Sequence, residues 1–163
     1  MKPNIRPMLA ADRPALMEIL RNTSEFTPQE VTVAEEVIDS YLYNPDNYTI
    51  FVAEVDKSVA GYICYGHTPL TEGTWDIYWL AVAPGKRGQG MGGALTAFAE
   101  ERIGESGGRL IIIETSSKPA YEKTRHFYLN RGYEIICRIP DFYAPNDDKI
   151  ILQKTLGAET EPF

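Results

Sequence analysis

The segment GKRGQGMGG, residues 85–93, holds the most distinctive chemistry of the chain. It contains five of the 13 glycines, and Lys86 and Arg87 stand beside them. Glycines allow backbone N–H groups to converge where side chains would otherwise intrude. The residues that follow predict a helix, whose N-terminus carries a partial positive charge of about +0.5 of an elementary charge. The segment therefore predicts an anion site, and a diphosphate is the expected guest.

Three other interpretations of this segment compete with the diphosphate site. Gly88, Gly90 and Gly93 satisfy the dinucleotide-binding pattern G-x-G-x-x-G, and Glu114 ends the next predicted strand. However, a five-residue gap separates Gly88 from the strand that ends at Val82, and too little chain follows for the second half of a doubly wound sheet. A P-loop needs Gly-Lys-Ser or Gly-Lys-Thr, which does not occur. The third interpretation, a flexible surface loop, stays open from the segment alone.

Metal and hydrolase chemistry find little support in the sequence. His67 and His126 show no metal-ligand spacing to each other. Ser116 and Ser117 lack the context of a nucleophile elbow. We therefore expect neither a metalloenzyme nor a hydrolase.

Hydrophobic periodicity and turn residues predict seven strands and four helices. Asp12 is the expected N-cap of the first helix, and the polar stretch 140–148 is predicted as a loop. The segment 157–163 is predicted as a flexible tail after a single domain, residues 1–156. The predicted strands are 4–9, 48–55, 59–66, 74–82, 109–115, 133–139 and 149–156, and the helices follow Asp12, lie around 34–41, run from about 91 to 104, and cover 121–132.

Composition limits the class of protein. The chain has 163 residues, of which 44% are hydrophobic, so one domain with a substantial core is expected. A net charge of −7 disfavours nucleic acid and anionic membranes as partners and suits a cationic co-substrate. Cys64 and Cys137 lie in apolar runs without C-x-x-C spacing, so buried thiols are expected rather than a disulfide or zinc site. With no apolar stretch of signal-peptide or membrane-span length, we expect a soluble cytoplasmic protein.

The order of these elements and two motifs resemble the GNAT family of N-acetyltransferases. Residues 87–92, RGQGMG, look like the R/Q-x-x-G-x-G/A acyl-CoA loop of that family. TRHFYLNRGYEII, residues 124–136, resembles the family's later helix-to-strand motif. The resemblance covers the chain from Asn4 to Leu156. It implies an α/β (α+β) fold with a mixed, mostly antiparallel sheet of about seven strands, helices on both faces, and a splay between the fourth and fifth strands.

The resemblance also implies how the coenzyme binds. Acetyl-CoA is the expected co-substrate, and no metal is required. Backbone amides of the loop would hold the pyrophosphate, and the edge of the fourth strand would pair with the pantetheine arm, since extended amide-bearing ligands pair with strand edges. The coenzyme-binding residues expected on this basis are Leu80, Ala81, Val82, Arg87, Gly88, Gln89, Gly90, Met91, Gly92 and Gly93.

Three residues are candidates for the chemistry. Tyr128 occupies the position where the family places its general acid, and core packing is its alternative role. Asp76 matches the position of a catalytic glutamate in the family's protein-lysine acetyltransferases, and solvent exposure at the strand edge is its alternative. Glu114 is the rival base, or binds the ammonium of the acceptor, or is simply a strand-terminal carboxylate. Ser116, Ser117, Lys118 and Arg125 are further candidates for contacting the coenzyme arm or its 3′-phosphate.

The resemblance implies an enzyme that acetylates a primary amine by direct attack in a ternary complex. The acceptor is a small molecule or the amino group of a peptide or protein, and the sequence does not choose between them. A non-catalytic coenzyme A sensor or interaction module is the competing hypothesis. Homodimers are common in the family, so a second copy of the chain is among the expected partners. Acidic residues in predicted loops are expected either to attract the acceptor or to be solvated surface: Glu25, Glu72, Asp141, Asp147 and Asp148.

Overall fold

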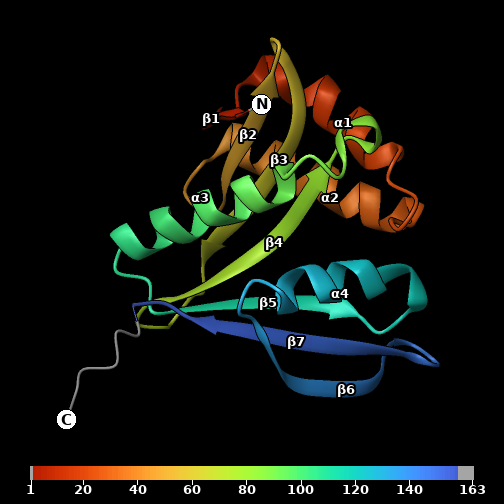
Figure 1. The fold of residues 1–163 in the computed structure, drawn as a ribbon. Coiled ribbons are helices and arrows are strands. Elements are labelled where there is room, and N and C mark those ends of the chain that lie inside the picture. The colour runs from red at the N-terminus through yellow and green to blue at the C-terminus, as the bar shows by residue number, and fades with distance from the viewer. Residues whose placement is uncertain (1, 158–163) are drawn as a thin grey trace.

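A seven-stranded sheet with the strand order β1-β2-β3-β4-β5-β7-β6 forms the frame of the molecule. The computed structural model describes residues 2–157. Neighbouring strands pair antiparallel, except that β4 and β5 run parallel. The predicted fold class is confirmed (Figure 1). The strands are β1 (Asn4–Pro7), β2 (Thr49–Val55), β3 (Ser58–His67), β4 (Thr74–Val82), β5 (Leu110–Ser116), β6 (Glu134–Ala144) and β7 (Asp147–Thr155); the α-helices are α1 (Arg13–Arg21), α2 (Pro28–Tyr43), α3 (Met91–Glu105) and α4 (Glu122–Leu129); and short 3₁₀ turns are η1 (Ala10–Asp12), η2 (Pro84–Lys86) and η3 (Pro119–Tyr121).

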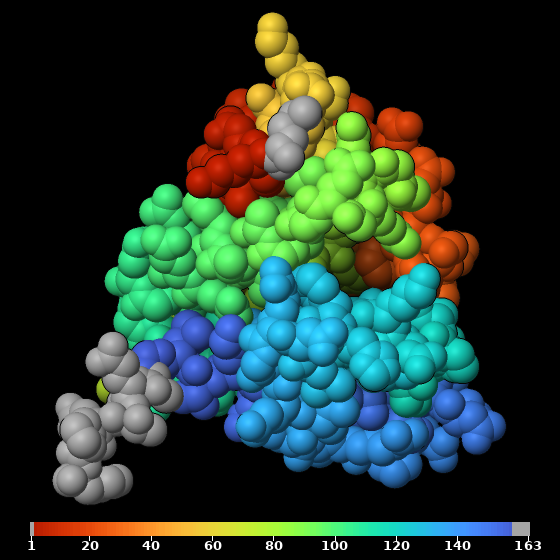
Figure 2. Space-filling model, viewed as in Figure 1, coloured from red at the N-terminus to blue at the C-terminus, as the bar shows by residue number. Residues whose placement is uncertain are grey.

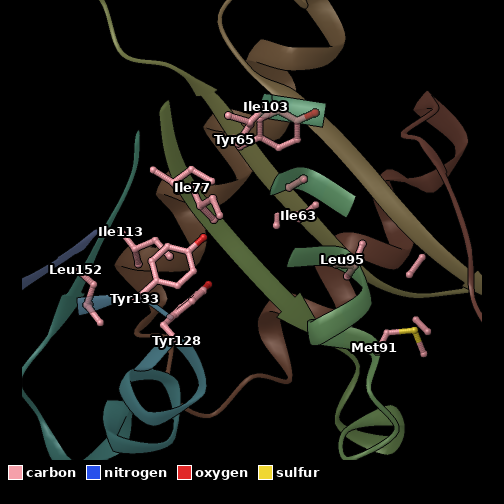
Figure 3. Close-up of a cluster of buried hydrophobic side chains, with 14 of the residues drawn as sticks. Ile63, Tyr65, Ile77, Met91, Leu95, Ile103, Ile113, Tyr128, Tyr133 and Leu152 are labelled. Carbon is pink, nitrogen blue, oxygen red and sulfur yellow. The ribbon is translucent and has the colours of Figure 1, made fainter. Parts of the chain in front are cut away.

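The helices bury their apolar stripes on the two faces of the sheet. Leu16 of α1 and Ile38 of α2 pack with Tyr62 of β3 in one hydrophobic cluster. Leu95 of α3 and Tyr128 of α4 belong to a second cluster on the other face (Figure 3). Burial of each large apolar side chain stabilises the fold by roughly 1.5–3 kcal/mol. The two cores hold β4 between them, so the position of β4 is tightly fixed.

A β-bulge in β4 coincides with an opening in the sheet. Two successive residues of β3 pair with Ile77 and Trp79, so Tyr78 has no partner on β3. An extra residue of this kind bends its strand and increases the local twist. The parallel pairing of β4 with β5 ends where Ile77 lies opposite Ile113. The two strands therefore part beyond this point, which confirms the predicted splay between the fourth and fifth strands.

The polar stretch 140–148, predicted as a loop, mostly extends the last two strands. β6 continues through Ala144 and β7 begins at Asp147, which leaves a short turn between them. Aromatic residues favour strands, and the Lys149 ammonium lies 4.0 Å from the centre of the Phe142 ring. Cross-strand packing of this kind outweighs the turn-forming residues in the stretch, which is why the loop prediction is wrong.

Two smaller expectations are also wrong. Cys64 is buried as predicted. Cys137 is exposed instead, because it lies on the edge strand β6, all of whose residues are exposed. Asp12 precedes α1 without capping it. Its carboxylate instead accepts hydrogen bonds from the Arg6 guanidinium at 2.7 and 2.9 Å and from the Leu9 N–H at 2.8 Å. Of the predicted C-terminal tail, residues 158–163 lie outside the described residues.

Candidate functional site

The glycine-rich loop leads from β4 into α3, and the N–H groups of residues 87–90 have no hydrogen-bond acceptor within residues 2–157. Gly88 and Gly90 both have φ +78°, a left-handed conformation that glycine adopts without strain. A Cβ atom at either position would meet nothing within 4 Å. The Ala94 N–H bonds to the Gly90 carbonyl at 3.0 Å and starts the helical ladder. The N–H groups of the first helical turn before Ala94 therefore have no helical partner. Open space, free amides and the helix dipole together fit a diphosphate.

Arg87 lies on this loop and already pairs with a carboxylate. Its two terminal nitrogens lie 3.2 and 3.3 Å from the two carboxylate oxygens of Glu25, in the segment between α1 and α2. Burial raises the pKa of the Glu25 carboxyl, but hydrogen bonds from Arg87 and the backbone outweigh this effect, so the net pKa is lowered. Glu25 is thus an anion held where Arg87 would meet a phosphate. The same guanidinium can serve either partner, but not both in a bidentate manner.

The end of the loop has a second role, in packing. The side chain of Met91 is buried in the core, so only its backbone faces the loop. A Cβ on Gly93 would lie 1.8 Å from the Arg131 guanidinium, and a Cβ on Gly92 would lie 3.6 Å from the Phe127 ring. Gly93 therefore allows α3 to approach the segment after α4 closely, whereas a side chain at Gly92 would make an ordinary van der Waals contact. Gln89 is exposed, and nothing in the described structure fixes its side chain.

A pocket of about 850 Å³ opens at the split between β4 and β5. Figure 2 shows the hollow between the two halves of the molecule, beside the segment that joins α1 and α2. The predicted coenzyme residue Leu80 lines this pocket, whereas Ala81 and Val82 do not. All three pair with β3, and none pairs with β5. The pocket is lined mainly by residues 76–80 of β4, 113–116 of β5, 26, 27, 29, 30 and 33 near the start of α2, and Tyr128 of α4.

Tyr128 combines burial with contact to the pocket. The residue is 4% exposed, and its ring packs against the rings of Phe127 and Tyr133 at 5.0 and 5.4 Å. The Tyr133 hydroxyl donates to Glu100 at 2.8 Å, whereas the Tyr128 hydroxyl has no hydrogen-bond partner among residues 2–157. In Figure 3 the Tyr128 ring rises from α4 toward β4. Burial raises the pKa of Tyr128, so the phenol is protonated and can donate a proton into the pocket.

The two candidate bases lie on the two strands that flank the split, Asp76 on β4 and Glu114 on β5, in different surroundings. Asp76 accepts a hydrogen bond from the Thr68 hydroxyl at 2.5 Å, and the Tyr78 hydroxyl lies 3.4 Å from the same oxygen. Burial and the neighbouring Asp76 raise the pKa of Tyr78 to about 12, so Tyr78 acts as a neutral donor. Glu114 instead forms an ion pair with Lys149 at 2.9 Å. Both carboxylates line the pocket, and the structure brings both within the same site.

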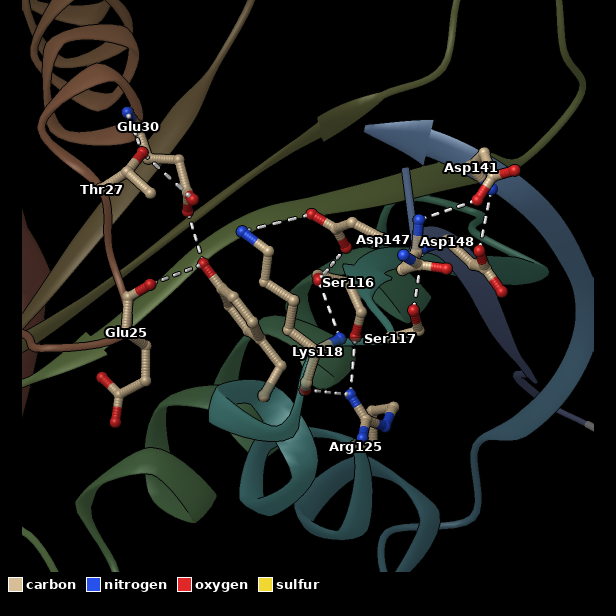
Figure 4. A network of polar contacts seen from close by, with 12 residues as sticks. Glu25, Thr27, Glu30, Ser116, Ser117, Lys118, Arg125, Asp141, Asp147 and Asp148 are labelled. Carbon is tan, nitrogen blue, oxygen red and sulfur yellow. Dashed lines mark hydrogen bonds and ion pairs between the residues drawn. The ribbon is translucent and has the colours of Figure 1, made fainter. Parts of the chain in front are cut away.

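The segment after β5 is held by an internal network rather than left free for a ligand. The Ser116 hydroxyl donates to Asp147, and the Ser117 hydroxyl accepts from the Asp148 N–H at 2.8 Å. Arg125 donates to the backbone carbonyls of residues 116 and 118 at 2.7 and 3.0 Å (Figure 4). These bonds stabilise the turn that leads into α4. The described contacts thus assign Ser117 and Arg125 a structural role.

Many residues that line the pocket were not among the predicted catalytic and coenzyme residues, and Tyr121, Glu30 and Asp147 are the ones whose contacts shape it. Tyr121 of η3 donates to Glu30 at 2.5 Å and lies 3.1 Å from the Glu25 carbonyl oxygen, so it joins the two sides of the pocket. Asp147 was expected in a loop but lies on β7, where it is buried against Ser116. The sequence Thr27-Pro28-Gln29-Glu30 is a capping-box pattern that predicts the start of α2 earlier than periodicity did.

Other kinds of site find no geometry in the described residues. Within residues 2–157, no group of three or more histidine, cysteine, aspartate or glutamate side chains is arranged to hold a metal ion. No helix in this part of the chain has the length and apolar character needed to cross a bilayer.

Comparison with known proteins agrees with this geometry. A sequence model described as "Acetyltransferase (GNAT) domain" matches residues 46–135. A solved structure from Desulfovibrio desulfuricans, assigned to the GNAT family, has 39% sequence identity and a TM-score of 0.89, and the match covers 94% of this chain and 98% of that one. No curated protein sequence matches this chain significantly.

Two more distant structures share the fold. An aminoglycoside 6′-N-acetyltransferase complexed with coenzyme A has 20% identity and a TM-score of 0.73, with 93% of this chain and 96% of that chain covered. The ribosomal-protein-S18-alanine N-acetyltransferase from Escherichia coli has 18% identity and a TM-score of 0.76, with 99% of each chain covered. The family model spans more than half of the chain, and the Desulfovibrio relative is similar over nearly its whole length. This chain therefore belongs to the GNAT family of acetyltransferases.

Proposed function

We propose that this chain transfers an acetyl group from acetyl-CoA to a primary amine, by direct attack within a ternary complex. The observation that carries the proposal is the joint position of three features. The strands split beside a bulge, unbonded amides of the glycine loop lie at one end of β4, and a buried phenol whose hydroxyl has no hydrogen-bond partner in the described part of the chain contacts the pocket. Acyl transfer needs such a combination of anion binding, an open strand edge and a proton donor.

The loop and the strand edge hold the acyl donor in this proposal. The amides from Arg87 to Gly92 bind the diphosphate, and Leu80 to Val82 offer an edge that is not paired with β5 to the amide-bearing arm. Acetyl-CoA supplies the thioester carbonyl and a thiolate leaving group. Binding at two separate places fixes the orientation of the thioester before the acceptor arrives, which lowers the entropic cost of the reaction.

The side chains of the pocket move the protons. Asp76 or Glu114 accepts a proton from the acceptor ammonium, directly or through one water, so that the neutral amine can attack the carbonyl carbon. Tyr128 donates its phenolic proton to the departing sulfur as the C–S bond breaks. The new C–N bond gives an N-acetyl product and free coenzyme A, and the phenol recovers its proton from solvent or from the amine. No step requires a metal ion.

Thiol release in the presence of acetyl-CoA and a panel of amines tests this proposal. We expect amine-dependent release of coenzyme A and an N-acetyl product detected by mass spectrometry. If the chain is the competing non-catalytic coenzyme sensor, coenzyme A binds but thiol release stays at the background rate. That result would remove the proposed activity and keep the binding site.

A further inference from the structure

The walls of the pocket carry more negative charge than the protein itself compensates. Four carboxylates line it: Glu30, Asp76, Glu114 and Asp147. Lys118 is the one cationic side chain among the described lining residues. The chain as a whole also carries an excess of acid, with a net charge of −7. The pocket is distinctive because four carboxylates from different elements line one cavity.

The ion pairs divide the four carboxylates into two kinds. Lys118 lies 3.4 Å from Asp147, and Lys149 lies 2.9 Å from Glu114, so each of these carboxylates has a cationic partner. Glu30 has only neutral donors, the hydroxyls of Thr27 and Tyr121. Asp76 also has only neutral donors, the hydroxyls of Thr68 and Tyr78. Within the described residues, two negative charges therefore face the pocket without a cation.

These two carboxylates stand on different walls of the pocket. Asp76 lies on β4 next to the last residue that pairs with β5, so it is near the split where the thioester must lie. Glu30 lies in the first turn of α2 and faces η3 through its hydrogen bond with Tyr121. A ligand with a single cation can neutralise one of them. Neutralising both requires a second positive charge at another point of the same molecule.

Aromatic side chains beside the two carboxylates suit the same kind of ligand. The rings of Phe26 and Trp79 line the pocket and meet edge to face at 5.5 Å. Tyr78, beside Asp76, also lines it. Aromatic faces attract ammonium groups and pack against the methylene carbons between them. Carboxylates at separate places with apolar rings among them match a chain that carries an ammonium group at each end.

We infer that the acceptor is a small amine with at least two ammonium groups, of the diamine or polyamine type. The inference rests on the proposed function, because it assigns the acceptor of that same site. One amino group lies beside Asp76 and is acetylated, and a second ammonium binds Glu30. Acetylation removes one of the two positive charges, so the product binds less tightly than the substrate and leaves the pocket more readily.

The test compares linear diamines with monoamines of the same chain length in the thiol-release assay. The variants are Glu30→Gln and, as a matched control, Glu36→Gln, which removes the same charge from an exposed position of α2. Glutamine at position 30 keeps the backbone N–H that donates to Thr27 and has an amide oxygen that can accept from the Tyr121 hydroxyl, so the change removes the charge and keeps these bonds. We expect at least one diamine to have a KM about 5- to 30-fold below that of its monoamine, as for a partly buried charge pair.

In the Glu30→Gln variant the KM of the diamine should rise to that of the monoamine, while the KM of the monoamine should stay as in the wild type. In the Glu36→Gln control both KM values should stay as in the wild type. Equal KM values for diamines and monoamines in the wild-type protein would overturn the inference and leave the acetyl transfer standing. A peptide with one amino group that is acetylated more efficiently than every diamine would also overturn it. Absence of turnover with all amines would overturn the proposed function, and the assignment of the acceptor with it.

Discussion

The ion pair between Arg87 and Glu25 should lower the affinity of the protein for coenzyme A. If Arg87 binds the diphosphate, the coenzyme must displace the Glu25 carboxylate, which lies 3.2 Å from the guanidinium. Glu25→Gln should then strengthen coenzyme binding, because it removes a competing anion. Arg87→Ala should weaken it. In the double variant the effect of Glu25→Gln should disappear, because Glu25 acts on the coenzyme only through Arg87.

The expected magnitudes follow from the exposure of the pair. The side chains of Arg87 and Glu25 are 43% and 24% exposed, so their ion pair is worth about 0.2–1 kcal/mol. Losing this competitor should lower the Kd of coenzyme A by about 1.4- to 5-fold. A charge-assisted bond from Arg87 to the diphosphate is worth about 1.5–3 kcal/mol. Its loss should raise the Kd by about 10- to 150-fold.

Isothermal titration calorimetry with coenzyme A on the four proteins of this cycle measures these values. Raised salt should reduce the Glu25→Gln effect, because the pair is exposed to solvent. An unchanged Kd for Arg87→Ala would exclude this residue from the diphosphate site. If Glu25→Gln weakens coenzyme A binding, or strengthens it equally in the wild-type and Arg87→Ala backgrounds, then Glu25 and the diphosphate do not compete for Arg87.

Three further predictions concern catalysis and stability. Tyr128→Phe should lower kcat about 10²- to 10⁴-fold when chemistry limits the rate, and an unchanged rate would remove the general-acid assignment. Asp76→Ala and Glu114→Ala identify the base: the variant that lacks it should lose the acidic limb in the pH profile of kcat/KM. If both variants keep the wild-type pH profile, the base is another residue. Asp12→Asn should cost about 2 kcal/mol of folding free energy, because Asp12 accepts two hydrogen bonds from Arg6. These bonds lower the pKa of Asp12 below its ordinary 3.8, so the stabilisation is complete above that pH and is lost as the pH falls further. Thermal unfolding across this range should therefore show a steeper acid loss for the wild type than for Asp12→Asn, and parallel curves would contradict the reasoning.

The sequence predicted most elements of the fold because their patterns are local. Strands such as β2 and β5 are dense in β-branched residues, and the glycine loop leads directly into a periodic helix. The end of β6 was not predictable in this way. Its aromatic residues gain their partner across the turn, where Lys149 stacks on Phe142, and this contact is absent from the local pattern.

The candidate site was predicted in part for the same reason. The loop residues and Tyr128 belong to motifs that can be read along the chain. Glu30 and Tyr121 meet across the pocket from positions far apart in the sequence, and only the fold places them together. The bulge at Tyr78 depends on how many residues β3 and β4 contribute to their pairing, which hydrophobic alternation alone does not determine.

A crystal structure of this chain with bound coenzyme A tests the central claim most directly. We predict the diphosphate on the amides of residues 87–92, the arm along the edge of β4 that is not paired with β5, and the sulfur between β4 and β5 within reach of the Tyr128 hydroxyl. A coenzyme that lies outside the split, or whose diphosphate contacts none of these amides, would contradict the account.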